Sequence, residues 1–193
     1  MKKKIFMITL AACLIILSIA STSLAYFTDT DAKSNVFTVG NVDITLTYET
    51  YNDDAKRLYP GQTYGNPATI KNDGTENAYV GAIINLTVPE GTSFETVSSI
   101  FTGLSNNTIK YVQTATGYTV YVVVEAELAK GYTANIFTDM AIPDAWGNAE
   151  MALLSGLSVN ITAYATQTVG FDNAAEALKA AFATNGWENY PNN

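Results

Sequence analysis

The sequence predicts an all-β protein, an antiparallel β-sandwich of jelly-roll-like type with short helical insertions and a C-terminal helix. Apolar and polar residues alternate with a period of two over much of the chain, which is the pattern of half-buried strands. Turn residues such as glycine, proline, asparagine and aspartate separate these runs at short intervals. The helices that a parallel α/β sheet would need between its strands are missing.

The N-terminal segment has the three parts of a secretory signal peptide. Lys2–Lys4 form a positive start, and an apolar run follows from Ile5 to about Ala20. Ser23 and Ala25 then occupy the −3 and −1 positions of a cleavage site, so that the mature chain would begin at Tyr26. We therefore expect residues 1–25 to be removed and the protein to be secreted to the extracellular matrix or the cell surface.

Two other interpretations of this segment stay open. The apolar run approaches the shorter end of a membrane-spanning length, so it is also compatible with an anchor. Leu10-Ala11-Ala12-Cys13 is similar to a lipidation signal, although the chain stays apolar beyond Cys13 instead of becoming polar. Membrane contact is expected only through an uncleaved signal peptide.

The charge balance limits the partners of the mature chain. Cleavage removes three of the 10 basic residues and none of the 18 acidic ones, which leaves a net charge of −11 on residues 26–193. A strongly acidic surface disfavours nucleic acid and anionic membranes as partners. We therefore expect no nucleic-acid partner.

Cysteine and histidine usage excludes much catalytic chemistry. The one cysteine, Cys13, lies in the predicted signal peptide, and the chain has no histidine. Nucleophile–histidine pairs and the usual histidine-containing zinc sites are therefore impossible in the mature chain. We expect no enzyme, no metal and no cofactor; a hydrolase that uses carboxylates alone, as glycosidases do, remains an alternative.

The first half of the mature chain predicts three strands. Asn41–Tyr48 alternates cleanly, and Ala68–Lys71 is a short strand that the Asn72-Asp73-Gly74 turn ends. Val80–Val88 alternates until Pro89. One face of each alternating strand is expected to be buried and the other to be in contact with water.

The second half adds more strands and two helical segments. Phe94, Val97, Phe101 and Leu104 have roughly helical spacing, so a short helix or a packed loop is expected within residues 90–107. A short helix is predicted from a cap at Asn148 to Leu154. The further strands are predicted at 109–112, 118–128, 135–142 and 157–165.

The C-terminal segment predicts a helix from about 173 to 184. Asn173 is a plausible N-cap because Glu176 follows it at capping-box spacing, and Asn185-Gly186 ends the helix. An isolated helix of this length is marginal, so we expect it to dock on the sandwich. The residues that share its apolar face are Phe171, Ala175, Leu178 and Phe182.

The residues around the cleavage site resemble the TasA/camelysin family of Gram-positive bacteria. That family typically begins its mature chain with A-[FY]-F-[ST]-D, followed by a phenylalanine, a glycine and an alternating strand. Weaker matches are Pro60-Gly61, Lys71–Gly74 with Ala78-Tyr79-Val80, and Ile161–Gln167. The positions that carry the pattern here are Ala25, Tyr26, Phe27, Thr28, Asp29, Phe37 and Gly40.

The resemblance implies a secreted structural protein, a biofilm fibre subunit that is exported with a signal peptidase of the SipW type. It implies self-assembly in which one subunit lends its N-terminal strand, residues 26–40, to the next subunit. An added strand satisfies the unpaired backbone of a sheet edge, which makes such an exchange physically plausible. The alternative is that the segment packs on its own domain, 41–193. The candidate anchors of the assembly strand are Tyr26, Phe27, Val36, Phe37 and Val39.

Several polar and aromatic groups are weighed as ligand sites. Asp29 and Asp31 are oxygen-rich but lack the glycine and glutamate of a calcium-binding EF-hand loop, and Asp53-Asp54 and Asp139 with Asp144 are single pairs. Glu125 and Glu127 share one strand face with Tyr121 and Val123, which predicts a row facing solvent. Tyrosines with Trp146 and Trp187 would suit a sugar-binding platform, so a monomeric surface or polysaccharide-binding module is the second functional hypothesis.

Overall fold

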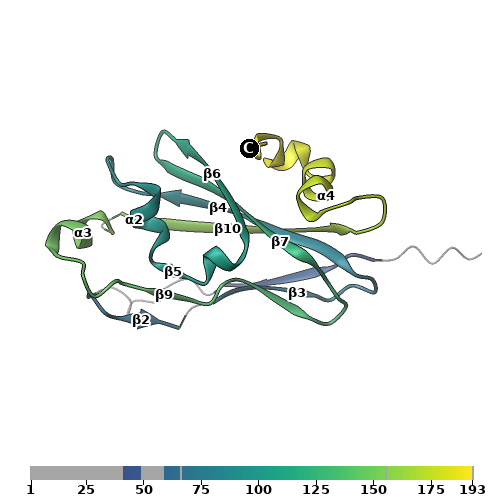
Figure 1. The fold of residues 1–193 in the computed structure, drawn as a ribbon, viewed down its shortest axis with the longest axis horizontal. Helices are drawn as coiled ribbons and strands as arrows, with labels where there is room; N and C mark the ends of the chain where they lie inside the picture. Colours follow the sequence, from purple (N-terminus) through teal and green to yellow (C-terminus); the bar gives the residue numbers. More distant parts are fainter. Residues whose placement is uncertain (1–40, 49–58, 66, 155, 193) are drawn as a thin grey trace, which may run out of the picture. The chain divides into compact units, whose positions relative to one another are not determined.

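The computed structural model describes residues 41–48, 59–65, 67–154 and 156–192, all of which lie in one compact unit of the chain, Val39–Asn193. Two antiparallel sheets face each other in it (Figure 1). The first has the order β1-β3-β8, with β1 (Ile44–Thr47), β3 (Ala68–Asn72) and β8 (Thr133–Phe137). The second has the order β10-β4-β7-β6, with β10 (Ser158–Gln167), β4 (Ala78–Thr87), β7 (Gly117–Leu128) and β6 (Thr108–Thr114).

Smaller elements close one end of the sandwich. A short sheet pairs β2 (Thr63–Tyr64), β9 (Asp139–Ala141) and β5 (Phe101–Thr102). Helix α2 (Phe94–Ser98) precedes β5, and the 3₁₀ turn η2 (Leu104–Asn106) precedes β6. The all-β prediction is confirmed, and the ambiguous segment 90–107 contains both a short helix and packed irregular chain. Within the described residues no helix reaches the length and apolar character of a membrane span.

The main core fills the space between the two large sheets. It contains Ile70 of β3, Val80 and Ile84 of β4, and Val120 and Val122 of β7, all of which are fully or almost fully buried. Burial of each such side chain stabilises the fold by about 1.5–3 kcal/mol relative to exposure. Because residues 41–193 contain no cysteine, apolar burial holds this unit together without disulfides.

The central strands β4 and β7 of the second large sheet are buried on both faces over much of their length, which corrects the expected wet face. Tyr79 and Ile83 of β4 and Tyr121 and Val123 of β7 point away from the sandwich interior and are nevertheless buried. The C-terminal segment covers them: α4 (Ala174–Ala181), η3 (Ala183–Asn185) and η4 (Trp187–Asn189) lie over this sheet as a third layer (Figure 1). We call residues 171–192 the C-terminal layer.

The C-terminal layer is anchored by aromatic side chains. Trp187 is fully buried and lies edge-on to Tyr121 and Tyr164, with ring centroids 5.6 Å and 5.9 Å away. The hydroxyl of Tyr121 donates to the Gly186 carbonyl at 3.0 Å, and that of Tyr164 donates to the Asn185 carbonyl at 3.0 Å. Burial, followed by the charge of Glu188, raises the pKa of both tyrosines above the ordinary value of 10.0.

Two helix predictions differ in detail from the structure. Asn173 caps α4 as predicted, since its side chain accepts a hydrogen bond from the Glu176 N–H at 2.9 Å. The α-helix ends at Ala181, and the chain continues as 3₁₀ turns to Asn189. Helix α3 (Asn148–Leu153) is capped by Gly147 instead of Asn148, because Glu150 accepts from the Gly147 N–H at 2.9 Å and fixes the first turn one residue earlier.

Candidate functional site: an open sandwich edge and a surface pocket

The two large sheets meet at one side through their edge strands, β1 and β10. Each is the last strand of its sheet, and the two are in contact with each other. Among the described residues, neither strand has a backbone hydrogen-bond partner on its outer side. We call this side the open edge.

Apolar side chains at the open edge face the core without being fully covered. On β10 they are spaced two residues apart, and all are half-buried and pack against the core. Ile44 and Leu46 of β1 are half-buried in the same way. The neighbouring strands β4 and β3 bury their core-facing side chains almost completely. The other edge strands, β6 and β8, also carry partly buried core residues, Ile109 and Ala134, so partial cover is a property of sheet edges in this domain. The half-buried row on β10 is Val159, Ile161, Ala163 and Ala165.

The chain enters the first sheet at the β3–β4 turn. Asn41 exchanges hydrogen bonds with Thr75 at 2.9 Å and 3.0 Å, and the Asp43 carbonyl accepts from the Asp73 N–H at 2.9 Å. Hydrogen bonds from Lys71 and Thr45 to the Asp73 carboxylate lower its pKa. These contacts place Asn41 at the end of the sandwich that holds this turn.

Buried Asn72 ties this entry point to both sheets. Its amide donates to the Glu76 carbonyl at 2.9 Å and to the Leu128 carbonyl at 2.8 Å, and its oxygen accepts from the Gly74 N–H at 3.0 Å. Side-chain amides with three satisfied bonds are among the polar groups that cores tolerate. From sequence, Asn72 is part of a turn signal, and nothing in the residue itself indicates that it joins β3 and the β3–β4 turn to β7.

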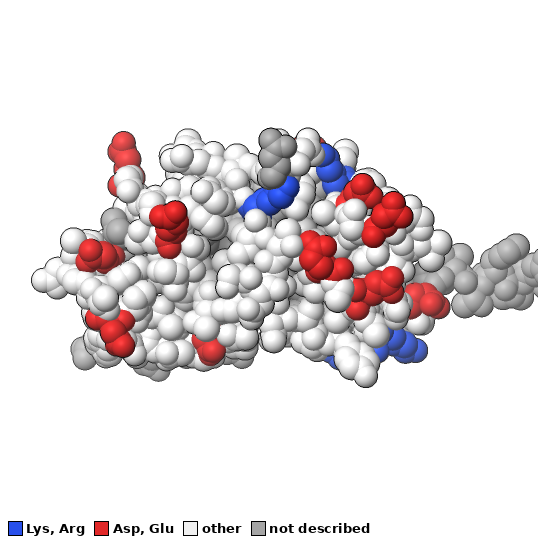
Figure 2. All heavy atoms as spheres, in the orientation of Figure 1, with Lys and Arg blue, Asp and Glu red and all other residues white. Residues whose placement is uncertain are grey.

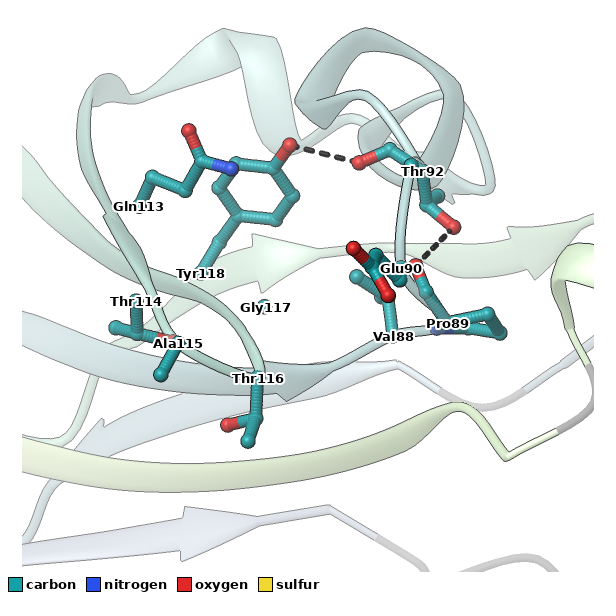
Figure 3. Close-up of a pocket in the computed structure, with 11 residues that line it drawn as sticks. Val88, Pro89, Glu90, Thr92, Gln113, Thr114, Ala115, Thr116, Gly117 and Tyr118 are labelled. Carbon is teal, nitrogen blue, oxygen red and sulfur yellow. Dashed lines mark hydrogen bonds between the residues drawn. The ribbon is translucent and has the colours of Figure 1, made fainter.

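A pocket of about 290 Å³ lies at the opposite end, between the β4–α2 connection and the β6–β7 hairpin (Figure 3). Gln113 and Tyr118 line one side, and Glu90 and Thr92 line the other. The Tyr118 hydroxyl donates to the Thr92 carbonyl at 2.7 Å, which holds the two sides together. Glu90 is the one carboxylate among the lining residues, so a pair of facing carboxylates does not form here.

The carboxylates and tryptophans that the sequence suggested as catalytic or sugar-binding groups do not come together in one site. Glu125 and Glu127 are exposed on β7, and Glu127 accepts from the Asn77 amide at 3.2 Å. The predicted solvent-facing row is wrong for Tyr121 and Val123, which the C-terminal layer buries. Trp187 is fully buried and Trp146 half-buried against the core, so the structure contradicts a tryptophan platform.

A metal ion has no fitting set of ligands in the part of the chain that the structure describes. No group of three or more histidine, cysteine, aspartate or glutamate side chains comes together there. Asp139 and Asp144 belong to no such group, and the chain offers no histidine. The cleavage-site residues Ser23, Ala25 and Tyr26, the assembly-strand anchors, Cys13, and the acidic pairs at 29–31 and 53–54 lie outside the described residues.

Figure 2 shows acidic side chains spread over one face of the molecule, with fewer basic ones. In the described part, Lys71 pairs with Asp73, Lys110 donates to the Pro191 carbonyl at 2.7 Å, and Lys179 donates to Asn192 at 2.6 Å. The excess of acidic over basic side chains on this face agrees with the negative net charge of the sequence.

Residues 1–87 match the sequence model of a family described as Camelysin metallo-endopeptidase. The search of curated proteins and the search of solved structures found no match. The family description names an enzyme, whereas the described residues offer no ligand set for a metal. The match includes the predicted signal peptide, the residues before β1, and strands β1 to β4. The resemblance to the TasA/camelysin family is therefore confirmed over residues 1–87 of this chain.

Proposed function

We propose that this chain is a non-enzymatic structural subunit of the extracellular matrix or cell surface that assembles by strand exchange. In this proposal, signal peptidase removes residues 1–25, and residues 26–40 of one subunit pair with the open edge of the next. The observation that carries the proposal is the half-buried apolar row of β10 beside β1, together with the lack of a backbone partner on the outer side of either strand among the described residues.

The predicted assembly strand and the open edge are chemically complementary. An added strand would bond the N–H and C=O groups on the outer side of β10, which have no partner among the described residues, and alternate side chains would complete the cover over Ile161 and Ala163. Phe37 and Val39 have the same period-two spacing as the row that they would cover. Covering such a row contributes about 25 cal/mol for each Å² of apolar surface removed from water.

The direction of the chain favours exchange between subunits. Asn41 is fixed at the β3–β4 turn, from which β1 runs inward along the open edge. A segment that precedes Asn41 starts at the end of the sandwich, so an extended segment can reach a neighbour placed beyond that end. Repeating this contact generates a head-to-tail, open-ended filament.

Filament formation by the mature chain, residues 26–193, tests the proposal. We expect electron microscopy to show filaments for the unmodified chain and none for Phe37→Ser with Val39→Ser. Thr38→Ala is the matched control because it lies between the two anchors and should leave filaments intact. Filaments that persist without the anchors would refute exchange. A lower urea midpoint for the dilute double variant would instead indicate packing on its own domain.

A second candidate function is the binding of a neutral saccharide in the pocket at the β6–β7 hairpin. Its polar lining, with Gln113 and Glu90 beside the Tyr118 ring, supports this candidate. Titration with oligosaccharides, followed by NMR, should move the Gln113 side-chain amide signal if the candidate is right. Gln113→Ala should abolish binding, Gln167→Ala on β10 should not, and an unmoved Gln113 signal would eliminate the candidate.

A further inference from the structure

Strand β6 forms the other edge of the four-stranded sheet. It pairs with β7 from Thr108 to Thr114 without any register shift, so the strand has no bulge. On its outer side, the described residues supply no backbone hydrogen-bond partner. Edge strands of this kind are templates for pairing with another chain.

The devices that usually protect an edge strand are missing from β6. It contains no proline and no bulge, and its one lysine, Lys110, does not project freely. The Lys110 ammonium donates to the Pro191 carbonyl and lies 5.0 Å from the centroid of the Tyr190 ring. Natural sheets commonly block edge pairing with an outward lysine, a proline or a bulge, so this strand is unprotected by comparison.

The strand also exposes apolar surface. Among the described residues, five large apolar or aromatic side chains are strongly exposed, and two of them are neighbours on β6. These two are Tyr111, 48% exposed, and Val112, 38% exposed. Phe94 stacks on the Tyr111 ring at 3.8 Å, which holds the ring in place.

Charge indicates which partner suits this edge. Lys110 is the one charged residue between Glu95 and Glu125, in a chain of net charge −8. Two copies of an acidic protein repel each other over most of their surfaces, and they can approach with least repulsion along this neutral strip. A partner recognised by charge would find little to contact here.

We propose that β6 pairs antiparallel with β6 of a second copy, which joins two four-stranded sheets side by side. Centred on Tyr111, this pairing uses all seven residues of the strand and places Lys110 opposite Val112 of the partner, so like charges do not meet. The contact lies at a different edge from the strand exchange proposed above. It would link subunits or filaments laterally.

Cross-linking of the mature chain tests the proposal, since the mature chain has no other cysteine. In Val112→Cys, the two thiols would be diagonal neighbours on one face, within reach of a short bis-maleimide. We expect a cross-linked dimer on a denaturing gel at least tenfold more abundant than for Thr133→Cys, an exposed position on the edge strand β8. Equal yields from the two variants would overturn the proposal.

A second pair of variants separates specific pairing from collision. Thr114→Lys, added to Val112→Cys, places a free lysine on the β6 edge and should reduce the dimer at least tenfold. Thr133→Lys, added to the same cysteine variant, should leave the yield unchanged, and an equal loss in both would contradict edge pairing. Adding Phe37→Ser to Val112→Cys should preserve the dimer, so failure of strand exchange and failure of β6 pairing give different results.

Discussion

Gly81 of β4 lies directly beneath Trp187 of the C-terminal layer. A Cβ atom at position 81 would stand 3.1 Å from Cη2 of Trp187 and 2.7 Å from Cδ1 of Leu178. It would also lie 2.7 Å from the carbonyl oxygen of Val122, which belongs to the backbone of the adjacent strand. The absence of a side chain at Gly81 is therefore what allows the C-terminal layer to pack closely on the sheet.

Gly81→Ala should loosen the C-terminal layer. Because the Val122 backbone cannot move aside as a side chain can, we expect overpacking to cost about 1–3 kcal/mol of unfolding free energy. Urea denaturation followed by tryptophan fluorescence measures the loss. Gly65→Ala is the control, since a Cβ there meets nothing within 4 Å, and equal effects of the two substitutions would contradict the proposed packing.

Trp187 should tolerate phenylalanine better than its burial suggests. Its indole N–H is buried and has no hydrogen-bond partner among the described residues, so Trp187→Phe removes an unsatisfied donor along with the lost volume. Trp187→Ala leaves a cavity and should cost about 3–5 kcal/mol. We expect the phenylalanine variant to lose less than half of that in the same urea titration, and equal losses would argue against an unsatisfied indole.

Asn72→Ala should lower the free energy of unfolding more than the loss of an exposed polar side chain would. It leaves the Leu128 carbonyl without the amide donor in a buried site, where an unsatisfied group costs about 1–3 kcal/mol, while the Gly74 N–H keeps its bond to the Asp43 carbonyl at 3.1 Å. Thermal or urea unfolding should show a loss of about 2 kcal/mol or more. Asn160→Ala, at an exposed position on β10, should stay within about 0.5 kcal/mol of the unmodified protein.

The C-terminal layer should make the protein sensitive to alkali. Burial, followed by the charge of Glu188, raises the pKa of Tyr121 above 10.0, so the folded state holds its phenolic proton more tightly than the unfolded state. The stability contributed by this group is fully present below about pH 10 and is lost as the pH rises through the folded pKa. Unfolding free energies measured from pH 8 to 11 should therefore fall above pH 10.

Tyr121→Phe isolates this effect. It should lower stability at pH 8 by about 1 kcal/mol, because the hydrogen bond to the Gly186 carbonyl is lost, and it should make the fall above pH 10 shallower. Tyr59→Phe is the control, since Tyr59 is 53% exposed. An unchanged alkaline slope in Tyr121→Phe would contradict a titrating role for this residue.

The strands were predictable because the alternation of apolar and polar residues along the sequence agrees with the burial of the core-facing side chains in the fold. The period-two run before the Asn72-Asp73-Gly74 turn and the long run after Gly117 both become strands with buried core-facing residues. The second burial layer was not predictable in the same way. Tyr79 and Ile83 are covered by Leu178 and Trp187, about 100 residues further along the chain, and period-two alternation carries no signal for such a cover.

The candidate site was predictable only in part. The sequence indicates an assembly strand from the residues near the cleavage site, but the place that would receive it emerges from topology, which brings β1 and β10 together at one side. The row at Val159, Ile161 and Ala163 is apolar enough for a fully buried strand. Its half-burial follows from the edge position of β10, which only the sheet order reveals.

Cross-linking between two differently tagged mature chains tests the central claim most directly. One chain carries Thr38→Cys in the assembly strand, and the other carries Thr162→Cys on the exposed face of β10. Strand exchange predicts a mixed dimer with a short bis-maleimide that appears only when both chains are present, with a yield that follows filament formation. An intramolecular link in the Thr38→Cys, Thr162→Cys double variant at high dilution, with no mixed dimer, would contradict the account.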